Sequence, residues 1–135
     1  MNEVKNMKHR LFLILFVVLI LTWCAVSTDK DVTYKQITMS EAVEMMESES
    51  YYIILDVRRP DEFAAGHIPN AINIPNESIG TGEISELPDK DQLILVYCRS
   101  GNRSKQASQK LVKLGYSNVV EFGGINDWKG EIEKW

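Results

Sequence analysis

Thiol and imidazole side chains are scarce in this sequence of 135 residues, which has two cysteines and two histidines. His9 lies in an N-terminal segment whose composition differs from the rest, so no cluster of metal ligands is expected around His67. Cys24 lies in the same segment and would be lost if that segment is removed. Cys98 would then be the only cysteine, which excludes an internal disulfide and marks a reactive thiol.

An excess of positive charge is also missing. Residues 28–135 contain 12 lysines and arginines against 18 aspartates and glutamates, a net charge of −6. This balance argues against nucleic acid as a partner. The chain has no repeats, and its 44% hydrophobic and 25% charged residues are typical of one small globular domain.

Only one long hydrophobic run occurs, from Leu11 to Leu21. It follows a short basic region and precedes small residues, which is the pattern of a secretory signal peptide with cleavage after Ser27. The run is shorter than the roughly 20 residues of a typical membrane-spanning helix. Residues 1–27 are therefore interpreted as a signal peptide or an N-terminal membrane anchor through residues 11–26, and the protein is expected to be exported to the cell envelope, periplasmic or extracellular.

Cys24 offers a third interpretation of this segment. The stretch LTWC resembles the lipidation signal of bacterial lipoproteins, in which the cysteine is modified. The residue before that cysteine is normally small, and Trp23 stands there instead. Lipidation is therefore the weaker interpretation.

Residues 34–135 are expected to form one α/β domain. Thr38 and Glu41 have the spacing of a helix capping box, and Pro60 suits the first turn of a short helix that ends at Gly66. Strands are predicted at 34–37, 51–57, 71–75, 93–97 and 119–122, and helices after Thr38, at 60–65, at 104–114 and around Trp128. Residues 76–92 are predicted to be a loop with at most one weak helix near Ile84. Strands that alternate with helices indicate about five mostly parallel strands with helices on both faces of the sheet.

Cys98 follows directly on a continuous apolar run, which is typical of a strand buried on both faces. In open parallel sheets, sites form beyond the carboxyl ends of the strands, and Cys98 lies at such an end. A cysteine between a strand and a helix faces unpaired backbone N–H groups, which favour an anion and lower the pKa of the thiol. Arg99 and Arg103 add positive charge, and Gly101 lets the backbone curve around the sulfur. The alternative is a buried structural cysteine.

Such a nest of N–H groups permits two chemistries. Cysteine phosphatases attack phosphorus and have five residues between their cysteine and arginine, whereas only four separate Cys98 from Arg103, and Ser104 stands where the arginine would be. The smaller cradle suits one additional sulfur atom better than a phosphate. The other chemistry is attack on a sulfane sulfur, which leaves a persulfide on Cys98.

Three segments resemble the rhodanese-like sulfurtransferases: LDVRRPDEFAAGHIPNAINIP at 55–75, CRSGNRS at 98–104 and FGGINDW at 122–128. The resemblance implies the rhodanese three-layer fold in single-domain form. It implies that Cys98 is the catalytic residue that accepts sulfur. It further implies that the donor is held by a substrate cradle formed by Arg99, Ser100, Gly101, Asn102, Arg103 and Ser104.

Asp56 and Arg58 are expected to support this loop. Asp56 ends a buried strand and could pair with an arginine of the loop, but the favoured interpretation is that Asp56, Arg58 and Glu62 form a structural network of ion pairs and caps. His67 is expected to be a hydrogen-bonded turn residue with no metal, and Trp128 a core residue.

The resulting functional hypothesis is an exported thiosulfate sulfurtransferase that needs no cofactor. Its partners would be a small sulfur donor and an acceptor, which could be cyanide, a thiol or a partner protein. The alternatives are a sulfur carrier without turnover and, less favoured, a cysteine phosphatase or arsenate reductase.

Overall fold

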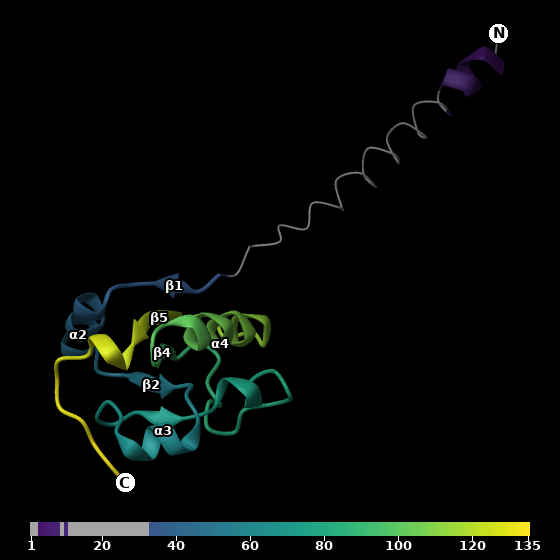
Figure 1. The fold of residues 1–135 in the computed structure, drawn as a ribbon. Helices are drawn as coiled ribbons and strands as arrows, with labels where there is room; N and C mark the ends of the chain where they lie inside the picture. The colour runs from purple at the N-terminus through teal and green to yellow at the C-terminus, as the bar shows by residue number, and fades with distance from the viewer. Residues whose placement is uncertain (1–2, 9, 11–32) are drawn as a thin grey trace. The chain divides into compact units, whose positions relative to one another are not determined.

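Five strands form a single sheet in the order β1-β5-β4-β2-β3, and every pair of neighbouring strands is parallel (Figure 1). The bounds are β1 Lys35–Gln36, β2 Tyr52–Asp56, β3 Ile72–Asn73, β4 Leu93–Cys98 and β5 Val119–Gly124. The longest strands, β4 and β5, lie next to each other, and β2 flanks β4 on its other side. This computed structural model describes residues 3–8, 10 and 33–135, and it confirms the predicted α/β fold class.

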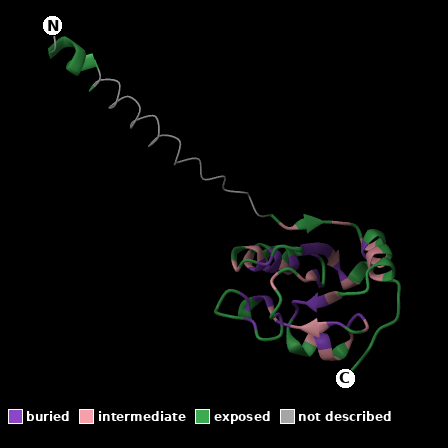
Figure 2. Ribbon diagram, turned by 180° about the vertical axis from the view of Figure 1, so that it is seen from behind, coloured by how far each residue is buried: buried purple, intermediate pink, exposed green. Residues whose placement is uncertain are grey.

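Helices cover both faces of the sheet. They are α2 Met39–Ser48, α3 Pro60–Ala65 and α4 Asn102–Lys113, with short 3₁₀ turns η1 Asn76–Ser78 and η2 Ile125–Asp127. Successive residues of a strand point to opposite faces, so Ile94 and Val96 pack with Leu111 of α4. Leu95 and Tyr97 belong to a second core cluster that includes residues of α2 and α3. The two clusters give three layers, and the buried residues in Figure 2 are concentrated along the strands.

The start of α2 follows the sequence prediction. The Glu41 carboxylate accepts the Thr38 backbone N–H at 2.7 Å, and the Thr38 hydroxyl accepts the Glu41 N–H at 3.3 Å. This reciprocal capping box satisfies donors that the first turn of a helix cannot bond internally.

The start of α4 differs from the prediction by two residues, because the helix begins at Asn102 and not at Ser104. Gly101 precedes it with φ of 108°, a left-handed conformation that glycine adopts without a side-chain clash. The glycine turns the chain at once, so the connection between β4 and α4 contains only residues 99–101.

The segment between β3 and β4 has no helix near Ile84; its only helical turn, η1, lies at the start of the segment. Ile84 and Leu87 are nevertheless buried and belong to the core cluster on the α4 side of the sheet. The segment is held by side-chain burial and contacts such as the bond from the Tyr116 hydroxyl to the Leu87 carbonyl at 2.7 Å.

Near the N-terminus, residues 3–8 are helical, and most of the predicted signal segment lies outside the described residues. Among the residues that are described, no helix has the length and apolar character needed to cross a membrane.

A buried ion pair closes the end of β2. The Arg58 guanidinium donates to both carboxylate oxygens of Asp56, with a shortest distance of 2.6 Å, and also to the Gly66 carbonyl at 2.7 Å. The side chains are 7% and 0% exposed. The pair therefore ties the end of β2 to the end of α3, and neither charge is left alone in the interior.

We predict that Asp56→Ala lowers the free energy of unfolding by about 3 kcal/mol or more, because it leaves the Arg58 charge buried without its partner. Urea unfolding of the variant and the wild type measures this change. Asp61→Ala is the matched control, since it removes the partner of Arg59 from an ion pair that is mostly exposed, and its midpoint should stay close to that of the wild type. Equal midpoints for all three proteins would contradict the prediction.

Candidate active site

The candidate site is built at the carboxyl end of β4, where Cys98 is the last strand residue. The Cys98 side chain is buried, and the loop that follows curves back over it. The Gly101 backbone N–H points at the Cys98 Sγ at 3.1 Å, and the Ser104 hydroxyl lies 3.5 Å from the same sulfur. A backbone donor is thus aimed at the sulfur, as the sequence had indicated for a loop that opens a helix, and the Cys98 thiol can donate to the Ser104 oxygen.

The pKa of Cys98 is set by opposing effects. Burial raises it, but the Ser104 hydroxyl and the backbone N–H groups of Ser104, Gly101 and Ser100 favour the thiolate, and the net effect lowers the pKa of the thiol. A thiolate is the nucleophilic form of cysteine, so the loop prepares Cys98 for attack.

The two arginines of the loop lie in different environments. Arg99 is exposed, whereas Arg103 is half-buried and donates two hydrogen bonds to Glu62 of α3, at 2.7 and 3.0 Å. These bonds lower the pKa of Glu62 to about 2 against the raising effect of its partial burial. Arg103 is therefore held by a carboxylate that stays ionised at any ordinary pH.

The supporting acid for the loop arginine is thus Glu62, and not Asp56. The Asp56 carboxylate at the end of β2 is bonded by Arg58 and makes no hydrogen bond or ion pair with a loop arginine. Asp56 and Arg58 hold the backbone next to the site. Of the three charged residues predicted to form the network, only Glu62 bonds a residue of the loop.

The remaining loop residues differ in exposure. Ser100 and Asn102 are exposed at the rim, while Gly101 and Ser104 are buried beneath it. Behind the loop, Gly124 of β5 approaches the Arg99 carbonyl so closely that a Cβ at position 124 would lie well inside van der Waals contact. The Asn126 N–H also donates to the Arg99 carbonyl at 3.2 Å. The end of β5 therefore fixes the position of the loop.

Glu121 is a residue of this site that sequence reasoning missed. It lies in the middle of an apolar strand, is only 3% exposed, and accepts the Ser104 hydroxyl at 2.6 Å and the Gly123 N–H at 2.9 Å. Gln36 of β1 donates to its other carboxylate oxygen at 3.3 Å. The sequence did contain a signal for this residue, because Glu121 is the one acidic residue in an otherwise apolar strand that is expected to be buried.

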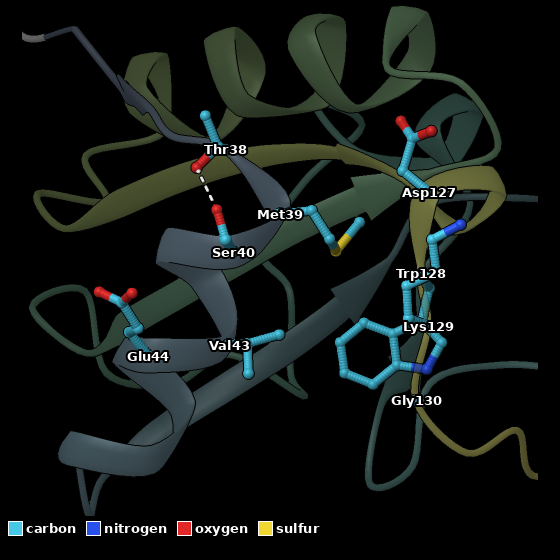
Figure 3. Close-up of a pocket in the computed structure, with 9 residues that line it drawn as sticks. All are labelled: Thr38, Met39, Ser40, Val43, Glu44, Asp127, Trp128, Lys129 and Gly130. Carbon is cyan, nitrogen blue, oxygen red and sulfur yellow. Dashed lines mark hydrogen bonds between the residues drawn. The ribbon is translucent and has the colours of Figure 1, made fainter.

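His67 and Trp128 lie away from the loop contacts. The His67 ring bonds the Phe63 carbonyl at 2.8 Å and stacks on the Phe63 ring, and in residues 3–8, 10 and 33–135 no three potential metal ligands come together. Trp128 packs against the core cluster on the α2 side and lines a groove with Met39 and Val43 of α2 (Figure 3).

Comparison with known proteins agrees with this geometry. The family model described as "Rhodanese-like domain" matches residues 38–131. The thiosulfate sulfurtransferase GlpE of Coxiella burnetii is 37% identical over 97 residues, which cover 71% of this chain and 88% of that protein. The adenylyltransferase and sulfurtransferase uba4 of Ogataea parapolymorpha is 33% identical over 112 residues, covering 82% of this chain but only 28% of that protein.

Among solved structures, a rhodanese-like domain protein from Staphylococcus aureus is 30% identical, with a TM-score of 0.65 over 75% of this chain and 98% of that chain. The family model spans strands β2 to β5, the Cys98 loop and the end of β5 that supports it. On this evidence, the chain belongs to the rhodanese-like family.

Proposed function

We propose that the protein is a sulfurtransferase that takes a sulfane sulfur from thiosulfate, or a similar donor, onto Cys98 and passes it to a thiophilic acceptor. The observation that carries the proposal is the buried Cys98 sulfur, which faces the Gly101 N–H at 3.1 Å. Relatives named thiosulfate sulfurtransferase support the choice of donor.

The reaction would proceed in two steps. The Cys98 thiolate attacks the outer sulfur of thiosulfate, a new sulfur–sulfur bond forms, and the sulfur–sulfur bond of the donor breaks with its electron pair leaving on sulfite. Cyanide or a thiolate then attacks the outer sulfur of the persulfide, and Cys98 leaves as a thiolate. The thiolate is thereby regenerated, and neither step needs an added oxidant or reductant.

The loop has a defined role in each step. Backbone N–H groups stabilise negative charge on sulfur without themselves changing protonation. Arg99 and Arg103 would attract the anionic donor and bind its oxygens by charge-assisted hydrogen bonds. A phosphatase is less well supported, because only four residues separate Cys98 from Arg103, whereas cysteine phosphatases have five between their cysteine and arginine.

We also propose that this transfer takes place outside the cytoplasm. The support is the basic and apolar pattern of residues 1–27, which is that of a secretory signal or a membrane anchor. The acceptor would then be a small thiol or a partner protein of the cell envelope.

We predict that the wild-type protein gains one sulfur atom after incubation with thiosulfate and that Cys98→Ser gains none. Intact mass with peptide mapping measures the gain and separates Cys98 from Cys24. Cyanide should remove the added sulfur. A persulfide that forms but does not turn over with cyanide or thiols would indicate the sulfur-carrier alternative, and no gain on a reduced Cys98 would refute the proposal.

We predict that Arg103→Ala raises the KM for thiosulfate about tenfold or more, since a hydrogen bond to a charged group contributes about 1.5–3 kcal/mol. Steady-state kinetics with varied thiosulfate measures this effect. Arg103→Lys keeps the charge but loses the two-point contact with Glu62, so its KM should lie between those of the wild type and Arg103→Ala. An unchanged KM for Arg103→Ala would exclude a role for Arg103 in binding the donor.

We predict that Gly124→Ala lowers turnover by about a hundredfold, because the added Cβ pushes the Arg99 carbonyl away and a shift of about 1 Å can cost that much. The same displacement takes the Gly101 N–H off the sulfur, so alkylation of Cys98 should move to higher pH. A variant with wild-type turnover and a wild-type alkylation profile would show that the loop tolerates the contact.

A further inference from the structure

Glu121 is a buried acid that the sulfur chemistry above does not use. It alternates along β5 with Val120 and Phe122, which belong to the core cluster on the α2 side, so its carboxylate faces α4. A buried charge is costly unless hydrogen bonds satisfy it. The Ser104 hydroxyl, the Gly123 N–H and the Gln36 amide supply three such bonds.

The Ser104 hydroxyl links this carboxylate to the cysteine. It has one proton and four neighbouring atoms that can accept it: the Glu121 carboxylate at 2.6 Å, the carbonyls of Gly101 and Gly123 at 2.9 and 3.3 Å, and the Cys98 sulfur at 3.5 Å. The charged acceptor at the shortest distance forms the strongest bond. The Ser104 proton therefore points toward Glu121, and Cys98 faces the oxygen lone pairs.

This arrangement treats the two forms of Cys98 differently. A thiol donates its own proton to the Ser104 oxygen, while a thiolate has to compete with Glu121 for the Ser104 proton. The negative charge of Glu121 also disfavours a second negative charge nearby. Both effects oppose ionisation, and they weaken without cancelling the support that the Ser104 hydroxyl and the backbone N–H groups give to the thiolate.

The other charged groups around the loop act in the opposite sense or are already paired. Arg103 favours the thiolate, with part of its charge offset by Glu62, and the positive charge of Arg99 is exposed to solvent. Asp56 on β2 is neutralised by Arg58. Glu121 differs from Asp56 and Glu62 because a single hydroxyl group, that of Ser104, connects it to Cys98.

We propose that Glu121 is a positioning residue that holds the Ser104 proton away from Cys98 and so limits how readily the cysteine ionises. The nucleophilicity of a thiolate falls as the pKa of its thiol falls, and the best attacking thiol has a pKa near the ambient pH. Without Glu121, the N–H groups of the loop would convert more of Cys98 to the thiolate, but that thiolate would be a weaker nucleophile. This role rests on the proposed sulfur transfer at Cys98.

Glu121→Gln tests the proposal, because the amide keeps the size of the side chain and its oxygen still accepts from Ser104 and Gly123. The rate of alkylation by iodoacetamide is measured against pH in the full-length protein, and the peptide containing Cys98 is quantified. We expect the midpoint to fall by about half a pH unit or more. The limiting rate at high pH should fall by about threefold for each unit of that shift, so the two profiles cross.

Three further variants define the route and keep the test open if Glu121→Gln does not fold. In a Ser104→Ala background, the shift caused by Glu121→Gln should largely disappear. Gln36→Lys, at an exposed position of β1, places an ammonium group beside the Glu121 carboxylate and should lower the midpoint by a smaller amount. Glu47→Gln removes an exposed charge on α2 and should change nothing.

Unshifted profiles for Glu121→Gln and Gln36→Lys would overturn the proposal, as would a midpoint that rises. An equal shift with and without the Ser104 hydroxyl would overturn the route through Ser104. Alkylation needs no sulfur donor, so absence of thiosulfate turnover in the wild-type protein with the expected shift intact would refute the proposed function, while the effect of Glu121 on the ionisation of Cys98 would stand.

Discussion

The bond from the Gly101 N–H to the Cys98 sulfur, at 3.1 Å, places three demands on the fold. The strand has to end at the cysteine, the chain has to turn within three residues, and the following helix has to begin with its free N–H groups directed at the sulfur. Gly101 meets the second demand through its left-handed conformation. The first demand is met at the edge of the parallel sheet, where β4 ends at Cys98 and the ends of β2 and β5 lie on either side of it.

Charge at this edge is divided among groups with separate tasks. Asp56 and Arg58 neutralise each other in the interior, and their bonds fix the backbone at the end of β2. Glu62 anchors Arg103 at the rim, where the cation remains partly exposed. Glu121 lies beneath the loop and bonds the Ser104 hydroxyl. The reactivity of the sulfur is therefore a balance between donors that favour an anion and a buried carboxylate that opposes it.

The sequence was sufficient for the fold because its signals are local. Runs such as 51–57 and 93–97 are continuous and apolar, and the capping box at Thr38 and the proline at 60 mark the starts of helices. The α4 boundary was predicted two residues late because no local pattern shows that Gly101 adopts a left-handed conformation. Ile84 and Leu87 lie in a polar segment, and their burial depends on the packing of distant elements.

The candidate site was less predictable, because it also depends on contacts between residues that are far apart in the sequence. The loop residues around Cys98 are contiguous and could be read directly, but their partners are not. Glu62 is separated from Arg103 by 41 positions, and Ser104 is separated from Glu121 by 17. Only the three-dimensional register of β5 beside β4 brings Glu121 under the loop. The export signal remains a prediction, because most of its residues lie outside those the structure describes.

The close approach of Gly124 to the Arg99 carbonyl bears on how this loop could be used in protein engineering. Gly124 has an ordinary extended backbone, with φ of −141°, so its own conformation does not require glycine. The requirement comes from a neighbouring segment. The short stretch that follows Cys98 is consequently not a portable module: a recipient scaffold would need an adjacent parallel strand that ends in a residue without a side chain, placed where the loop backbone rests against it.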